Sequence, residues 1–261
     1  MSSLRIFFIG GWTSYRALFA WLTPWILIPT FIVGPVFQIL FFAFVGRTAG
    51  VGTDTFYVIG NAIQYASIPC LFAMGNAIGG ERQSQTLGLL LASPARRVPL
   101  FLGRSLPVII NGLLCSLLAL VLGSLILGVS IEPSAAPMLV VAVAVSAFAC
   151  TGLGLAMAAV GLRVRDTAVL ANVVMGILLI FCGVNVALTA MPDWMASVGS
   201  VLPLTHGIEA ARDTVAGASA AEVSGLLFTE AGIGIAYVLV GLVLLAYFER
   251  ASRQHASLDL A

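Results

Sequence analysis

Side chains able to do acid–base, nucleophilic or metal chemistry are few in this sequence, and they are scattered. The two histidines, His206 and His255, have no second histidine or cysteine at the spacing that zinc sites use. No HExxH, GxSxG or paired-carboxylate motif occurs. The cysteines each lie in an apolar stretch without a CxxC pair, so we interpret them as small buried residues in preference to disulfide or zinc partners; they are Cys70, Cys115, Cys150 and Cys182. The sequence therefore predicts no metal site and no cofactor site on this chain, and it indicates that the chain is not an enzyme.

The basic residues themselves exclude a Walker A nucleotide site. That motif needs a lysine to reach the phosphates, but all 12 basic residues are arginine. The apolar stretches also carry almost no charges of the kind that ion-coupled transporters use. We therefore expect any energy source for this protein to lie on a partner chain.

The composition fixes the class of protein that must position these residues. Hydrophobic residues make up 60% of the 261 residues and charged residues only 9%, with a mean hydropathy of +1.08. A soluble domain is about 45–50% apolar and about 25% charged, so a soluble enzyme and a disordered regulator are excluded. The net charge of +1 offers no basic surface for nucleic acid. The sequence predicts an integral membrane protein without room for a large soluble domain.

The apolar stretches predict an all-α membrane protein with six transmembrane helices, since one span uses about 20 residues. Before them, residues 4–20 alternate arginine with aromatic and aliphatic side chains, as in a helix lying in the membrane interface. A ragged start to the first span is the alternative for 4–20. The expected spans are 21–45, 56–78, 100–127, 135–161, 167–190 and 223–248.

The arginines predict the orientation of these spans. Ten of the 12 fall before the first span, after the last, or in the even-numbered connections, and only Arg47 and Arg212 fall on the opposite side. Cytoplasmic loops carry the excess of arginine in membrane proteins. We therefore expect both termini in the cytoplasm of a multi-pass protein. The absence of lysine points to a GC-rich, bacterial source, and hence to the bacterial plasma (inner) membrane.

Polar groups within the spans are the next candidates for function. Glu230 is the one carboxylate inside a span, and we expect it to reach the interface or to pair with Arg212 or Arg47, with proton coupling as the alternative. The amides hold helices together or face a substrate path. They are Gln38, Asn61, Gln64, Asn76, Asn111, Asn172 and Asn185, of which Gln38, Asn61, Gln64 and Asn172 are the candidate pathway residues.

The connection after the second span contains a short amphipathic helix. Leu87, Leu90 and Leu91 recur at the spacing of one helix face, and Pro94 ends the helix because its ring disfavours helical geometry at the preceding residue. The expected helix covers 80–94. Its leucine face fits a groove on another protein, with a bilayer-surface connector as the alternative, and the polar start at Glu81 favours the groove.

This connection resembles that of the type-2 ABC exporter (ABC-2) permeases. The run ERQSQTLGLLLASP at 81–94 is similar to the family pattern E-x-x-x-G-T-L-x-x-L-L-x-[ST]-P, with Gln85 where glycine is common. Further matches are MPDW at 191–194, LPLTH at 202–206, Ala211–Arg212 and Arg165–Asp166. The resemblance covers nearly the whole chain, which we treat as a single domain, 1–261. Drug-resistance permeases and nodulation lipo-oligosaccharide export permeases are members of this family.

The resemblance implies partners and roles that the residue pattern alone does not. The permease would form a homodimer, and two copies of a cytoplasmic ABC ATPase would bind ATP and Mg²⁺ and seat the helix at 80–94. Residues 191–215 would form short outer-leaflet helices that close the exit, shaped by Pro203, His206 and Arg212. The residues expected to couple to the ATPase are Glu81, Arg82, Gln85, Thr86, Leu87, Leu90 and Leu91.

The function implied is export of a hydrophobic or amphipathic compound, drug-like or lipid-like, as in multidrug efflux. The apolar spans favour such a cargo over an ion. A polysaccharide or glycolipid export permease is the alternative cargo class, and a non-transporting membrane scaffold that binds an ATPase is the alternative role. Membrane lipids, but no nucleic acid, are expected as further partners.

Overall fold

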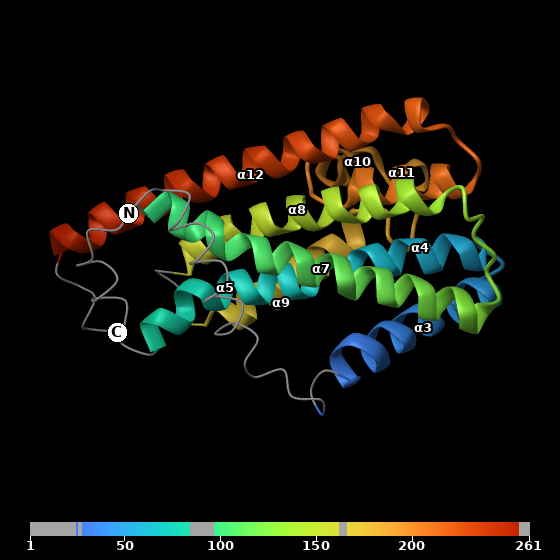
Figure 1. The fold of residues 1–261 in the computed structure, drawn as a ribbon, viewed down its shortest axis with the longest axis horizontal. Coiled ribbons are helices and arrows are strands. Elements are labelled where there is room, and N and C mark those ends of the chain that lie inside the picture. The colour runs from blue at the N-terminus through green and yellow to red at the C-terminus, as the bar shows by residue number, and fades with distance from the viewer. Residues whose placement is uncertain (1–24, 26–27, 84–96, 162–165, 256–261) are drawn as a thin grey trace.

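The structure, a computed structural model, describes residues 25, 28–83, 97–161 and 166–255, with side chains at 25, 28–76, 103–161 and 166–248. The described part of the chain is helical and contains no strand (Figure 1). The expected interfacial helix at 4–20 lies outside it. The helices are η1 (Pro29–Val33), α3 (Gly34–Ala49), α4 (Asp54–Gln64), α5 (Ser67–Gln83), α7 (Arg97–Leu127), α8 (Ala136–Val160), α9 (Thr167–Phe181), η2 (Leu188–Ala190), α10 (Asp193–Gly199), α11 (Thr205–Val215) and α12 (Ala220–His255).

Local sequence signals explain where several helices begin and end. The side chain of Thr53 accepts a hydrogen bond from the Phe56 amide at the start of α4, and Asp166 does the same for two amides of α9. Gly50 ends α3 with a φ of 67°, a conformation that suits glycine. Arg47 and Asp54 form an ion pair across this turn, which joins the end of α3 to the start of α4.

Five helical segments in the described residues are long and apolar enough to cross a membrane. They are Pro29–Ala49, Asp54–Asn76, Gly103–Leu127, Ala136–Val160 and Ala220–Phe248. The protein is therefore an all-α, multi-pass membrane protein. The count of six spans stays a prediction, because α9 has only 15 residues.

Two of the expected spans differ from the structure. The stretch expected as one helix at 167–190 ends at Phe181, and residues 182–187 that follow are not helical. At about 1.5 Å per residue, α9 is about 22 Å long, less than a hydrocarbon core of about 30 Å. The stretch expected at 56–78 is broken between α4 and α5 at Tyr65 and Ala66.

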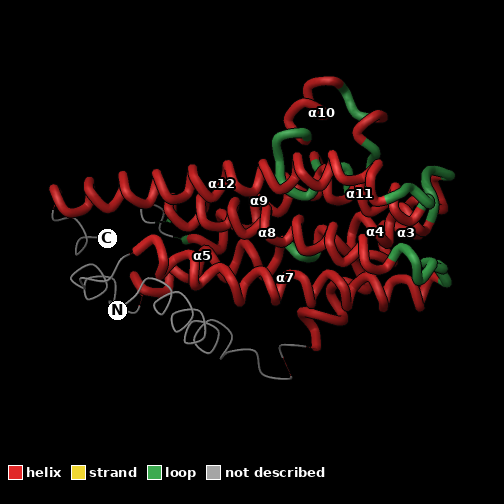
Figure 2. The backbone as a smooth tube through the Cα atoms, turned by 45° about the horizontal axis from the view of Figure 1, so that its top comes forward, coloured by secondary structure: helices red, strands yellow, loops and turns green. Residues whose placement is uncertain are grey.

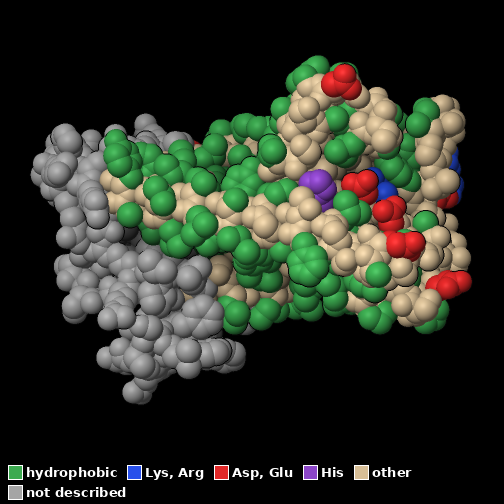
Figure 3. All heavy atoms as spheres, turned by 90° about the horizontal axis from the view of Figure 1, so that it is seen from above, with side chains coloured by type: hydrophobic (Ala, Val, Ile, Leu, Met, Phe, Trp, Pro, Cys, Tyr) green, Lys and Arg blue, Asp and Glu red, His purple; other side chains and the backbone are tan. Residues whose placement is uncertain are grey.

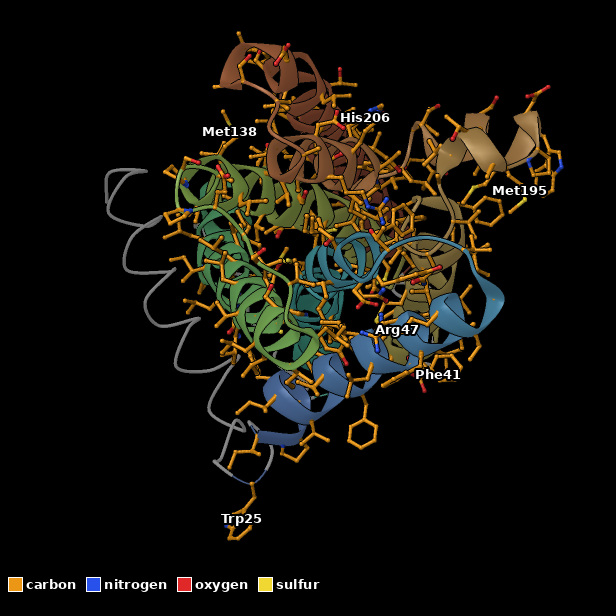
Figure 4. The ribbon with its side chains drawn as sticks, turned by 90° about the vertical axis from the view of Figure 1, so that its right-hand side faces the viewer. Trp25, Phe41, Arg47, Met138, Met195 and His206 are labelled. Carbon is orange, nitrogen blue, oxygen red and sulfur yellow. The ribbon has the colours of Figure 1, made fainter. Side chains whose placement is uncertain are left out.

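The pair α4 and α5 occupies the centre of the bundle. Seen down the bundle, α3, α7, α8 and α9 surround it, and α12 lies beyond α8 (Figure 4). Of the two, α4 contacts α3, α7 and α11, whereas α5 contacts α7, α8 and α9. Every residue from Tyr57 to Ser67 is buried. A polar side chain on this segment therefore faces other helices and not lipid.

The helices α8 and α12 form the longest helix–helix contact, and glycines make it close. A Cβ built on Gly152 would lie 2.6 Å from the Gly234 carbonyl oxygen, and one built on Gly241 would lie 2.8 Å from the Ala156 nitrogen. Small residues let helix backbones approach in this way in membranes. These two helices therefore pack as one unit.

The bundle has two distinct ends (Figure 1). One carries the α3–α4, α7–α8 and α11–α12 connections, and the other carries the end of α5, the start of α7 and the end of α12. Figure 2 shows α10 standing away from the bundle beside the first end. In Figure 3, charged side chains gather toward the end that carries the α3–α4, α7–α8 and α11–α12 connections. The middle of the same face is mainly hydrophobic.

Candidate functional site

The predicted coupling residues fall at the edge of the described chain. Glu81 and Arg82 lie in the last turn of α5, whose backbone stays helical through Gly79 and Gly80 to Gln83. The expected start of a separate helix at residue 80 is therefore corrected, because α5 continues past it. The remaining coupling residues lie outside the described residues; they are Gln85, Thr86, Leu87, Leu90 and Leu91.

A polar network lies between α3, α4 and the chain after α9. The Gln38 side-chain nitrogen donates to Asn61 Oδ1 and to Gln64 Oε1, each at 2.9 Å. Asn61 in turn donates to Asn185 Oδ1 at 2.8 Å and to the Tyr57 carbonyl at 2.9 Å. Asn61 and Gln64 are buried, while Gln38 and Asn185 are partly exposed. The network thus runs from the surface of the chain into its core.

Three of the four predicted pathway residues therefore come together, and the fourth does not. Asn172 lies on an exposed face of α9 and donates to the Ala168 carbonyl of its own helix. The fourth member of the network is instead Asn185, in the non-helical stretch. The sequence marked Asn185 as polar and within a span, but not as a neighbour of Asn61, which precedes it by 124 residues.

Arg212 on α11 fastens three parts of the chain together. Its guanidinium donates to the carbonyls of Gly183 at 2.7 Å, Val184 at 2.8 Å and Phe56 at 3.0 Å. It also lies over the Phe56 ring, with Cζ 3.5 Å from the ring centroid. Gly60 on α4 leaves the space for this, since a Cβ there would lie 2.5 Å from a guanidinium nitrogen.

The guanidinium of Arg212 satisfies carbonyls that a helix would otherwise have used. Gly183 and Val184 follow the end of α9, and such carbonyls need a partner when water is excluded. The helix α11 lies outside the candidate spans. Burial lowers the pKa of Arg212 to about 10, so the side chain stays cationic at neutral pH. One side chain thus stabilises the break after α9.

The expected pairing of Glu230 with Arg212 or Arg47 is wrong. Arg47 pairs with Asp54, and Arg212 binds carbonyls. Glu230, on α12, is completely buried and accepts hydrogen bonds from the backbone amides of Leu204 at 2.6 Å and Gly207 at 3.3 Å. Both amides belong to the start of α11, where the helix dipole favours negative charge. Glu230 therefore acts as the cap of a different helix.

Pro203 lies just before α11, and His206 lies in the first turn of that helix. Pro203 is buried, and its carbonyl accepts a contact from the Cys182 sulfur at 3.2 Å. His206 is partly exposed, with its Nε2 3.0 Å from the Ser200 carbonyl oxygen. The three predicted gate residues thus lie on one short segment, but each contacts different neighbours. Figure 4 places His206 toward α12 and Met195 of α10 away from the bundle.

Metal chemistry finds no support in the described part of the chain. It contains no group of three or more His, Cys, Asp or Glu side chains that could hold a metal ion. What the geometry offers instead is a helical bundle with a polar network near one end and the helix α11, whose two ends are held by Glu230 and Arg212.

Comparison with known protein families identifies the class of protein to which this bundle belongs. The model of the family described as ABC-2 type transporter matches residues 15–215, most of the chain. The chain belongs to the ABC-2 type transporter family. No curated protein matches the sequence. ABC-2 members are the membrane permease components of ABC transporters, not their catalytic subunits, and the family implies an ABC ATPase as partner. The matched range of this ABC-2 permease contains the network, Arg212 and α11; Glu230 lies beyond it.

Proposed function

We propose that this ABC-2 permease exports a hydrophobic or amphipathic compound, drug-like or lipid-like, from the cytoplasm. The observation that carries the proposal is the network of Gln38, Asn61, Gln64 and Asn185, which concentrates uncharged polar groups in an apolar bundle. Such amides can hydrogen-bond a polar headgroup without the cost of a buried charge.

An apolar surface beside the network suits the rest of such a molecule. On α3, Phe37, Phe41 and Phe44 are 69%, 62% and 52% exposed, and they lie on the helix that carries Gln38. An amphipathic compound would place its polar end at Gln38 and its apolar part along these rings. This favours a lipid-like or drug-like cargo over a polysaccharide, which would need many hydrogen-bonding groups along its path.

The proposal includes the assembly that drives export. Two copies of the permease would form a homodimer in the bacterial plasma membrane, each with a cytoplasmic ATPase copy that binds ATP and Mg²⁺. The end of the bundle with the α5 terminus, near Glu81 and Arg82, would face the cytoplasm. The end with α10 and α11 would face outward, and Pro203, His206 and Arg212 would shape the outer gate.

The first experiment is purification of the tagged permease from detergent-solubilised source membranes, with identification of the proteins that accompany it. A stoichiometric protein with Walker A and ABC signature motifs is the expected result. Absence of any such ATPase, from a preparation that is folded and of dimer size, would contradict the proposal. Compounds that stimulate the ATPase of the complex would then separate a transporter from a non-transporting scaffold.

The coupling residues are tested in the same complex. Glu81→Arg and Leu90→Asp should each uncouple ATP hydrolysis from export. The first reverses a charge at the expected contact with the ATPase, and the second places a charge in the apolar part of that contact. Ser134→Asp is a matched control, since it adds a charge at an exposed position in the α7–α8 connection, at the opposite end of the bundle from Glu81. Normal export by both coupling variants, correctly inserted, would show that the coupling assignment is wrong.

A further inference from the structure

We propose that Glu230 is a positioning residue that holds the start of α11 against α12 and thereby keeps residues 191–215, the outer segment, closed. The inference rests on the proposed role of α11 at the outer gate. The proposed pathway does not use α12, the last long helix. Our inference is that α12 holds the gate.

The contact joins two elements that are distant in sequence. Both carboxylate oxygens of Glu230 are used, one by the Leu204 amide and one by the Gly207 amide, 26 and 23 residues earlier in the chain. A helix is normally capped by a residue just before it. The residue before α11 is Leu204, whose side chain has no acceptor. The first turn of α11 therefore depends on α12 for its cap.

The backbone at Leu204 is strained in this arrangement. Leu204 has a φ of 85° and is the one non-glycine residue with positive φ in the described chain. Its side chain is completely buried, and its amide is the donor to Glu230. Strained residues persist when their surroundings over-determine them, and they gather at functional sites. If the Glu230 contact broke, the backbone at Leu204 could return to a relaxed conformation. The strain therefore favours breaking the contact, and the two hydrogen bonds favour keeping it.

The packing around Gly207 extends the contact to a second helix. A Cβ at Gly207 would overlap Ser146 of α8, so the start of α11 lies directly on α8. Since α8 and α12 pack closely along their glycines, the start of α11 is fixed to this helix pair. The other end of α11 is fixed by Arg212 to α4 and to the chain after α9.

The helix α11 thus connects two groups of helices through two separate polar contacts. Any motion that separates α8 and α12 from α4 must break the contact at Glu230 or the contact at Arg212. Arg212 has three carbonyl partners and an aromatic ring, whereas Glu230 has two amides and a strained residue opposing it. The geometry points to Glu230 as the contact that releases when the outer segment opens.

The anchoring is tested by amide hydrogen exchange of the purified full-length permease in lipid nanodiscs. Glu230→Ala should speed exchange in peptides covering Leu204–Gly207 by about tenfold to a hundredfold, because two hydrogen bonds to a carboxylate are lost. Glu230→Gln keeps one acceptor oxygen and should give a smaller increase. Tyr237→Phe is the matched control on α12: it removes a bond to the Val201 carbonyl at 3.3 Å and should leave this exchange unchanged.

The closure is tested with the same variants in liposomes loaded with carboxyfluorescein, without ATP. Glu230→Ala and Glu230→Gln should release dye faster than the parent protein and Tyr237→Phe. Unchanged exchange at Leu204–Gly207 in both Glu230 variants would overturn the anchoring, and a uniform rise over all helices would reduce it to general stability. Faster local exchange with unchanged dye retention would overturn the closure.

If Glu230→Ala does not fold, the comparison of Glu230→Gln with Tyr237→Phe decides both points. Failure of the proposed function is seen separately, as the absence of an ATPase partner or of ATP-dependent export by the parent protein. Neither the exchange nor the dye measurement needs that partner.

Discussion

At the residue scale, the two charged groups around α11 show how a buried charge is tolerated here. Arg212 and Glu230 do not meet, although each is the kind of partner that the other needs. Both bind backbone groups that regular structure leaves free: carbonyls after α9 accept from the two terminal nitrogens of Arg212, whose Nε has no partner among the described residues, and first-turn amides of α11 donate to Glu230. A charge that fills orphan backbone groups stabilises irregular backbone where water is excluded.

Replacing Arg212 by lysine should lower the stability of the protein. A single ammonium has no planar fork with which to hold three carbonyls and a ring together, so we expect a loss of about 1.5–3 kcal/mol. Thermal unfolding in detergent measures it. Arg47→Lys is the matched control, because its ion pair with Asp54 is exposed and should change stability by under about 1 kcal/mol. Equal midpoints for the two variants would show that the three carbonyl bonds contribute nothing.

Asn61 and Asn172 form a second matched pair. Asn61→Leu removes bonds to Gln38, Asn185 and the Tyr57 carbonyl, and we expect a loss of about 1–2 kcal/mol, since one such bond in a membrane protein averages about 0.6 kcal/mol. Asn172→Leu should be nearly neutral, because that side chain bonds only its own helix. Thermal unfolding again gives the comparison, and a larger effect at Asn172 would contradict the network.

At the element scale, the apolar runs locate long helices well and short ones poorly. Residues 100–127 and 135–161 are expected as spans and are close to α7 and α8, because a long apolar run favours one continuous helix even with Pro107 inside α7. The run at 167–190 is equally apolar, yet α9 stops at Phe181. Hydropathy reports composition and not whether the backbone is helical.

The cause of that break lies elsewhere in the chain. The stretch after Phe181 is held by Arg212, 28 residues after Val184, and contains Gly183 with a φ of 72°. No local pattern shows that a later arginine will satisfy these carbonyls. The same holds for Glu230, where the sequence showed a carboxylate in a span but not that the amides of Leu204 and Gly207 would receive it.

The contact between α8 and α12 can be tested with two glycines of the same helix. Gly241→Leu should destabilise the protein by at least about 1–3 kcal/mol, as in other overpacked sites, because even its Cβ would press on the α8 backbone. Gly232→Leu should be neutral, since nothing lies within 4 Å of a Cβ there. Unfolding midpoints of the two variants check this, and a neutral Gly241→Leu would mean that the helices lie farther apart.

At the scale of the whole molecule, the arginines divide between the two ends of the bundle as the sequence predicts. Arg47 and Arg212 lie toward the end with α10 and α11, while Arg82, Arg97 and Arg104 belong to segments at the other end. The sequence therefore predicts at which end of the bundle an arginine lies. The side-by-side packing of α4 with α3, α7 and α11 was not, because it depends on shape.

The orientation of the bundle is tested with single cysteines and a membrane-impermeant maleimide. Ser134→Cys, in the exposed α7–α8 connection, should react in intact cells, whereas Ser252→Cys, near the end of α12, should react only after permeabilisation. The native cysteines are buried and should give a low background. The reverse labelling pattern would invert the topology and place the arginine-rich end outside.

The shortness of α9 has a consequence for the lipid around the protein. At about 22 Å, this helix gives the bundle one side that is too short for the hydrocarbon layer of about 30 Å. If α9 crosses the membrane as the sequence predicts, lipid beside it would thin, and such hydrophobic mismatch costs a fraction of a kcal/mol per Å, which tilting or oligomerisation relieves. Contact between two copies along α9 would remove the thinned lipid from both. The bilayer itself would then favour pairing of the protein along this side.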